Sequence, residues 1–454
     1  MTPQLFTRTL LAALAAAAGG AQATTQLDLY SYNPPASLNM AMQGLSSGGA
    51  YGVSNNDTND VMLNTATGRF TVIAGGTGQA SGISANGRLV SGNSVAGIGS
   101  CSVDGVTSNA CGLRQASIYN TSTGNWTPLG SLGYQAGYAL DGTHDDVQST
   151  ALGISSNGKT VVGWSYFKST PGSSAVLHPT VFRNGQVYDL NASGAGQNGR
   201  ALASSGDGSV VVGYKSNSAV GSVWTWNGSG YVESTAPTIA HPVTGVQTPI
   251  QVSTVSDNGV WAAGGSVNAL AINYGPGGIF APYTVTFSQA TLWNTQTNSA
   301  LLIPFDHLID TTNSFSNPDI VRNAKSTVTG VSDAGVAIGT FNLVFTGANA
   351  DFSTFDTWIY NAHGDGTTQT FDSYLTELGV GLTATQHVSQ LYSMAADGSS
   401  ISGTIYDSSI NQTLAFVVHP LTAVPEPGTL LMFGAALPLL AWRRRAAAAR
   451  KEAA

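Results

Sequence analysis

The chain has 454 residues, of which only 9% are charged and 55 are Gly, and this composition disfavours long solvated helices and favours short strands joined by tight turns. Residues 24–424 hold ten Lys or Arg and twenty-two Asp or Glu, with no basic cluster. This excludes nucleic acid as an expected partner, because phosphate binding needs clustered cations. We therefore expect an all-β protein.

The N-terminus has the three parts of a secretory signal peptide. Arg8 precedes an apolar run over residues 10–18, and Ala21 and Ala23 form an A-x-A cleavage site. We predict a signal helix within a signal peptide over residues 1–23, cleaved after Ala23. The alternative is a buried Ala-rich helix, which an uncapped run at the extreme terminus does not favour.

A phrase of the form G-[IL]-S-x-[DN]-G, followed by an apolar stretch and Gly, recurs through the middle of the chain. Two copies are clear, four are looser and one is degenerate: 82–87 and 153–158; 204–213, 255–264, 331–339 and 394–403; and 44–54. Asn-Gly or Asp-Gly between short apolar runs indicates a hairpin, so we predict type I′ turns with positive φ at both central residues.

Most copies are followed by an aromatic strand, a polar turn and another short strand, as in residues 116–126 and 180–188. Two hairpins per repeat give four strands, and a closed ring of such sheets leaves no long exposed edge. We predict a β-propeller of about seven blades, six to eight, over residues 24–420. A β-solenoid or a pair of sandwiches stays open, because turn chemistry does not fix how hairpins pack.

The middle of the chain offers few candidates for other chemistry. Cys101 and Cys111 are expected to form a disulfide in an oxidising periplasm. The acidic residues of 141–146 are a weak Ca²⁺ candidate without EF-hand spacing. Ser46 stands in a G-x-S-x-G pattern but is expected to be a turn residue. We expect no metal site, no cofactor and no catalytic residue.

The C-terminus, residues 421–454, combines a motif, an apolar run and a basic cluster. The motif is Val424, Pro425, Glu426 and Pro427, and the cluster is Arg443, Arg444 and Arg445. Two prolines keep the motif extended, whereas the apolar run over 430–442 is too short for the ~20 residues that span a bilayer. We expect a short apolar helix that enters the inner membrane transiently, with the arginines on the cytoplasmic side.

This tail resembles the PEP-CTERM sorting signal, whose Val-Pro-Glu-Pro motif matches residues 424–427. The resemblance implies processing by an exosortase in a Gram-negative bacterium that makes exopolysaccharide, and delivery to the periplasm, cell surface or extracellular matrix. The same tail also carries the label of an ice-binding protein C-terminal domain, although residues 424–454 offer no flat ice-matching face. The repeats resemble extracellular HAF-type repeats, which implies architecture and location only.

The function expected first is that of a non-catalytic surface or matrix protein that binds exopolysaccharide or another envelope component. Trp126, Trp164, Trp224 and Trp261 either stack on sugars or form blade core. The alternative is a secreted propeller enzyme that acts on glycans through carboxylates in the central channel. A third possibility, ice or mineral binding, needs regular Thr arrays that the sequence lacks.

Overall fold

The computed structural model describes residues 26–30, 41–55, 60–73, 80–103, 106–134, 148–169, 175–191, 198–215, 220–240, 245–273, 284–305, 320–346, 351–361 and 366–419. All but Gln26 belong to one compact unit, Leu27–His419. The predicted signal peptide with Ala21 and Ala23, and the sorting tail, lie outside the described residues. Within the described ranges, no helix is long and apolar enough to cross a membrane.

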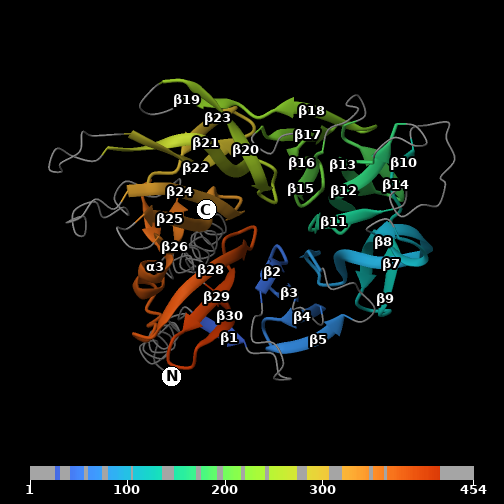
Figure 1. The fold of residues 1–454 in the computed structure, drawn as a ribbon. Coiled ribbons are helices and arrows are strands. Elements are labelled where there is room, and N and C mark those ends of the chain that lie inside the picture. Colours follow the sequence, from blue (N-terminus) through green and yellow to red (C-terminus); the bar gives the residue numbers. More distant parts are fainter. Residues whose placement is uncertain are drawn as a thin grey trace, which may run out of the picture. The chain divides into compact units, whose positions relative to one another are not determined.

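The described chain forms seven mainly antiparallel blades, which confirms the predicted propeller; one parallel pairing joins the fifth and sixth blades into a single nine-stranded sheet (Figure 1). Blade 1 contains β2 (Ala41–Leu45), β3 (Tyr51–Asn55), β4 (Asp60–Asn64) and β5 (Arg69–Ile73). Blade 2 contains β6 (Gly82–Ile83), β7 (Leu89–Val103), β8 (Val106–Asn120) and β9 (Asn125–Pro128). Blade 3 has β11 (Ser149–Ile154) as its first, inner strand, followed by β12 (Thr160–Lys168), β13 (Val176–Arg183) and β14 (Gln186–Asp189), and the short β10 (Gly133–Tyr134) pairs in parallel with β12.

Blade 4 contains β15 (Arg200–Ser204), β16 (Val210–Tyr214), β17 (Ser222–Trp226) and β18 (Tyr231–Thr235). Blade 5 has β20 (Gln247–Val255) as its first, inner strand, followed by β21 (Trp261–Asn273), β22 (Thr284–Asn294) and β23 (Ser299–Leu302), and the short β19 (Thr238–Ala240) pairs with β20. Blade 6 contains β24 (Ile320–Val331), β25 (Val336–Thr346), β26 (Asp351–Asn361) and β27 (Thr368–Thr370), followed by helix α3 (Phe371–Glu377). Blade 7 contains β28 (Gln386–Met394), β29 (Ile401–Asp407), β30 (Gln412–His419) and the N-terminal strand β1 (Gln26–Tyr30).

The ring closes between the last blade and the first. Seven clusters of buried apolar residues each join two neighbouring blades, and one of them packs Met42 and Leu63 of blade 1 against Val417 of blade 7. In addition, β1 pairs with β30, so residues from near both chain ends share blade 7. This pairing covers the edge that β30 would otherwise expose.

The second strand of a blade is buried on both faces, which explains its consecutive apolar residues. Neighbouring residues of a strand point to opposite faces. Val161 therefore packs in the cluster between blades 2 and 3, while Val162 packs in the cluster between blades 3 and 4. Val211 and Val212 divide in the same way around blade 4.

The repeat phrase forms the turn between the first and second strands of a blade, but the predicted type I′ geometry is wrong. Among the described residues, Gly87 has a positive φ and Asn86 does not. Ser84 is buried, its carbonyl accepts from the Gly87 N–H at 2.9 Å, and its Oγ donates to Asn86 Oδ1 at 3.0 Å. The Asn side chain thus binds locally, and a four-residue loop replaces the two-residue turn.

A true type I′ pattern occurs in the outer hairpin of blade 3. Asn184 and Gly185 both have positive φ, 52° and 75°, between the paired residues Arg183 and Gln186. The two-residue Asn-Gly rule therefore holds in this hairpin, where Asn184 follows an arginine and not a buried serine.

The repeat turns also hydrogen-bond to one another around the ring. The Ala85 N–H donates to the Ser156 carbonyl at 2.9 Å, and the Asn157 N–H donates to the Gly206 carbonyl at 2.9 Å. The remaining bonds between turns of neighbouring blades continue this pattern as far as Ala396 of blade 7, whose N–H donates to Ser47 of blade 1. The turns thus fix neighbouring blades against each other, from blade 2 round to blade 1, at the C-terminal ends of the first strands.

Candidate functional site

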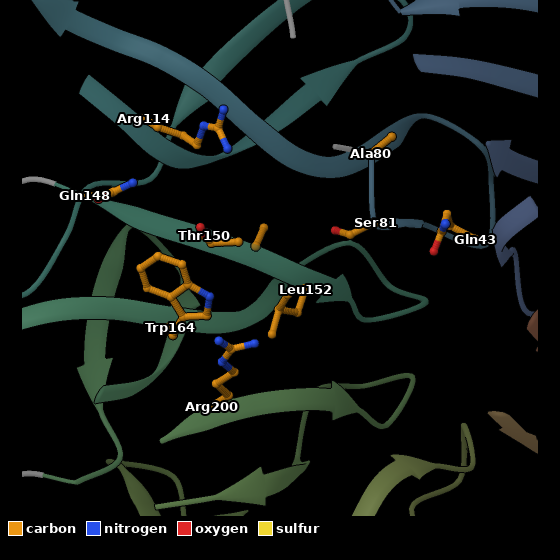
Figure 2. A pocket seen from close by; sticks show the side chains of 10 residues that line it. Gln43, Ala80, Ser81, Arg114, Gln148, Thr150, Leu152, Trp164 and Arg200 are labelled. Carbon is orange, nitrogen blue, oxygen red and sulfur yellow. The ribbon is translucent and has the colours of Figure 1, made fainter. Parts of the chain in front are cut away.

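A cavity lies at the opposite, N-terminal ends of the first strands of blades 1 to 4. These strands contact one another in succession and are the inner strands of the ring. The cavity has a volume of about 550 Å³, within the ~300–1,000 Å³ typical of ligand sites. It is lined by Gln43, Ala80, Ser81, Arg114, Gln148, Thr150, Ala151, Leu152, Trp164 and Arg200 (Figure 2).

Bulges in the inner strands place two of these side chains. Six inner strands carry a register shift at the same place in the repeat, which leaves one residue extra there: Gln43, Leu152, Leu202, Ser253, Thr329 and Tyr392. Strands β24 and β28 each carry a second shift nearer their N-terminal ends. An extra residue breaks the alternation of faces and re-aims its side chain. Gln43 of β2 and Leu152 of β11 line the cavity for this reason.

The aromatic wall of the cavity is Trp164, which is half-buried on β12. It lies opposite Thr150 in the β11–β12 pairing, and its ring meets Tyr166 edge-on at a centroid distance of 5.4 Å. The tyrosine supports one side of the indole, so the ring is held in place while another part of it lines the cavity. Trp164 is therefore a rigid, flat surface for a ligand.

Two arginines supply the charge of the cavity. Arg114 comes from β8 and is half-buried, and Arg200 begins β15 and is exposed; in Figure 2 its side chain extends toward Leu152 and Trp164. Neither guanidinium has a hydrogen-bond or ion-pair partner among the described residues, and none of the ten described lining residues is a carboxylate. The site presents donors and positive charge to a ligand.

Buried hydrogen bonds fix the wall between blades 2 and 3. The Ala151 N–H donates to Asn93 Oδ1 at 3.1 Å, and the Ala116 N–H donates to Ser149 Oγ at 3.0 Å. Ser149 Oγ in turn donates to the Gly130 carbonyl at 2.6 Å. Since Asn93 and Ser149 are both fully buried, they hold β11 against its neighbour and leave the cavity pre-formed.

Four carboxylates, Asp207, Asp257, Asp333 and Asp397, lie instead in the repeat turns, away from the cavity lining. Asp257 accepts from Ser156 Oγ, and Asp333 accepts from the Asn258 N–H at 2.7 Å. Burial, together with repulsion from Asp333 and Asp207, raises the pKa of Asp257 although the Ser156 hydroxyl opposes this. Among the described residues, no group of three potential metal ligands is positioned to hold an ion.

A buried His–Asp pair in blade 3 has no counterpart in the sequence expectations. His178 is 1% exposed, its Nδ1 lies 2.9 Å from Asp189 Oδ2, and its ring stacks on Phe167 at 4.4 Å. Asp189 also accepts from the Asn191 N–H at 2.8 Å. The pair joins β13 to the end of β14 and lies outside the cavity lining.

The four tryptophans separate into core and site. Trp224 is buried in the core between blades 3 and 4. Trp126 and Trp261 are half-buried and pack against clusters between other blades. Only Trp164, of these four, lines the described cavity.

Ser46 is the turn residue that the sequence predicted. It is fully buried between β2 and β3, and its Oγ accepts from the Tyr51 N–H at 3.1 Å. The chain continues into a strand and not into the helix that a nucleophile elbow needs.

The remaining candidates stay predictions. The side chains of Cys101 and Cys111 are not described, although their backbones are: Cys101 pairs with Ser108, and Cys111 pairs with Gly99. The acidic residues 141–146 and the tail residues Val424, Pro425, Glu426, Pro427, Arg443, Arg444 and Arg445 lie outside the described ranges.

The two arginines of the cavity are what sequence reasoning missed. They lie outside the repeat phrases, and they line one cavity only because blades 2 and 4 flank blade 3. The one sequence feature that could have drawn attention to these arginines is the scarcity of cations, since residues 24–424 hold only ten Lys or Arg.

Comparison with protein families finds one match, a PEP-CTERM protein-sorting motif over residues 423–445. The match covers the predicted motif and the basic cluster. The chain is therefore an exported protein with an exosortase sorting signal, of the kind that crosses the inner membrane in Gram-negative bacteria. A search of curated proteins finds no match.

Solved structures similar to the chain are distant. The β-propeller domain of Myceliophteria thermophila Cps50 (Swd1) is 8% identical, with a TM-score of 0.41 over 88% of this chain and 100% of that one. Hydrazine synthase from Kuenenia stuttgartiensis is 12% identical, with a TM-score of 0.40 over 87% and 97% of the two chains. TolB from Acinetobacter baumannii is 13% identical, with a TM-score of 0.32 over 58% of this chain and 53%, about half, of TolB.

Proposed function

We propose that this exported protein is a non-catalytic surface or matrix protein, and that it binds exopolysaccharide in the cavity beside Trp164. The observation that supports this most is a pre-formed cavity that combines an aromatic wall with side-chain donors that have no partner among the described residues. The apolar face of a sugar ring stacks on an indole. Its hydroxyl groups bind the amides of Gln43 and Gln148.

The alternative from the sequence, a glycan-processing enzyme, needs a pair of carboxylates at the bound sugar. The described lining of the cavity supplies none. An assay for release of reducing sugar from the same polysaccharide separates the two functions.

The test compares two tryptophans with matched surroundings. Trp164 and Trp126 are both half-buried and each contacts a tyrosine, with ring centroids 5.4 and 5.3 Å apart, but only Trp164 lines the cavity. We expect Trp164→Ala in the full-length protein to weaken binding to exopolysaccharide by about tenfold, or ~1.4 kcal/mol, because the stacking surface is lost. Trp126→Ala should leave the affinity unchanged.

Binding is measured by calorimetry with exopolysaccharide from the producing strain, and the thermal midpoint of each variant controls for folding. Equal affinity of the Trp164→Ala variant and the native protein would contradict the proposed site. Release of reducing sugar by the native protein would favour the enzyme instead.

A further inference from the structure

We infer that the cavity selects acidic sugars, and that Arg114 and Arg200 bind the carboxylates of a uronic-acid polysaccharide. The inference rests on the proposed glycan-binding function and names its substrate class. It starts from the charge of the site, since two cations line one cavity in a region where acidic residues outnumber basic ones.

Two of the other described cations are bound within the fold. Arg183 donates to the Gly208 carbonyl at 2.7 Å and to the Tyr231 hydroxyl at 3.1 Å, and it lies over the Trp226 ring. Lys215 pairs with Glu233. The exposed residues Arg69, Arg88 and Lys159 also have no side-chain partner among the described residues, so what sets Arg114 and Arg200 apart is that both line one cavity.

The repeat shows that Arg200 is not a structural requirement of its position. It stands two residues before the extra residue of the β15 bulge. The equivalent residues of the other bulged inner strands are all uncharged: Ala41, Thr150, Gln251, Thr327 and Gln390. The fold therefore does not require a charged residue at this position of the inner strand.

Guanidinium groups and carboxylates fit each other closely. Arg presents parallel N–H donors that bind both oxygens of a carboxylate. Arg200 extends toward Trp164, so a sugar ring on the indole can direct its carboxylate to that guanidinium. Arg114, from the neighbouring β8, is positioned to bind the carboxylate of another sugar in the same chain. Because the rest of the unit is acidic, the cavity is also where repulsion of such a polymer is least.

The experiment compares an oligouronic acid with the same oligomer after its carboxyl groups have been reduced to alcohols. The full-length protein is titrated with each by calorimetry at low and high salt. We expect the acidic oligomer to bind at least about tenfold more tightly at low salt, and salt to weaken only the acidic oligomer.

Arg200→Gln and Arg114→Gln should each reduce affinity for the acidic oligomer about tenfold and leave the neutral oligomer unaffected. Arg88→Gln is the matched control, because Arg88 is exposed in a repeat turn, at the other end of an inner strand. Arg200→Lys should retain part of the affinity, since it keeps the charge but loses the paired donors.

The outcomes separate this inference from the proposed function. If both oligomers bind equally and the arginine variants bind like the native protein, the selectivity for acidic sugars is wrong and glycan binding stands. If the native protein binds neither these oligomers nor exopolysaccharide, both proposals are wrong. Thermal midpoints close to that of the native protein show that a lost affinity is not a lost fold.

Discussion

The two ends of the inner strands differ in how closely they follow the repeat. At the C-terminal ends, successive blades reuse a buried serine and a glycine with positive φ, and the turns bind one another. At the N-terminal ends, blades 1 to 4 contribute different side chains to one cavity, among them Trp164 and Arg200. The repeated end holds the ring together, and the irregular end offers groups that a ligand can bind.

We expect the repeat turns, at the C-terminal ends of the inner strands, to control the stability of the protein. Substitution of their glycines should give the largest loss of stability. A Cβ on Gly208 would overlap the buried side chain of Thr160 in blade 3, whereas a Cβ on Gly185 would meet nothing within 4 Å. Both residues have a positive φ, 71° and 75°. We expect Gly185→Ala to cost ~1–2 kcal/mol from φ alone and Gly208→Ala to cost ~1–3 kcal/mol more from overpacking.

Urea unfolding of the two variants measures this difference. Equal destabilisation would show that the turn glycines serve only their backbone conformation and not the contact between blades.

The buried serine of the turn should give the next effect. Ser155 Oγ accepts from the Thr160 N–H at 3.0 Å and donates to Asn157 Oδ1 at 2.8 Å. Ser155→Ala leaves the buried N–H without that acceptor, and we expect a loss of ~1–3 kcal/mol. Ser229→Ala is the control, because Ser229 is an exposed serine that also binds an Asn side chain, and it should change stability by under ~0.5 kcal/mol.

The same unfolding assay applies. If the Ser155→Ala variant proves as stable as the Ser229→Ala variant, the buried serine does not stabilise the repeat turn.

Two carboxylates of the repeat turns, Asp257 and Asp207, should make stability depend on pH in opposite directions. Burial raises the pKa of Asp257, so the folded state holds its proton more tightly and stability falls as the pH rises through the raised pKa. Burial also acts against ionised Asp207, but hydrogen bonds from Ser209 and Ser205 outweigh it and lower the pKa. Asp207 therefore contributes stability above its ordinary pKa, which is lost as the pH falls through the lowered one.

At neutral pH we expect Asp257→Asn to raise the thermal midpoint and Asp207→Asn to lower it, each by less than about 1 kcal/mol in stability because both carboxyls retain solvent contact. Both differences should vanish in acid: that of Asp257 below the ordinary aspartate pKa, and that of Asp207 below its lowered folded pKa. Thermal unfolding at several pH values gives the result, and shifts of the same sign would contradict the assignment.

Substitutions in the cavity, at the N-terminal ends of the inner strands, should have the smallest effect on stability. Arg114→Gln and Arg200→Gln remove no polar contact with a described residue, so we expect changes within ~0.5 kcal/mol. A loss as large as that of Ser155→Ala would show that these arginines are structural, and the difference between the two ends would disappear.

Part of the fold followed directly from the sequence. Asn-Gly and Asp-Gly turns with apolar strands predicted hairpins and blades, and even the degenerate phrase around Ser46 forms a complete first blade. The turn type did not follow, because the serine two residues before Asn86 binds its side chain and lengthens the loop. That residue was visible in the repeat phrase, but its role depends on its burial in the folded protein.

The sequence by itself determined the strands, the repeat and the sorting signal at residues 423–445, because turn chemistry and terminal motifs are local properties of the chain. Only the tertiary structure decided that β1 completes blade 7 and that Arg114, Trp164 and Arg200 share a cavity. These relations join residues far apart in the chain, and they arise from the closure of the ring and the packing of its neighbouring blades.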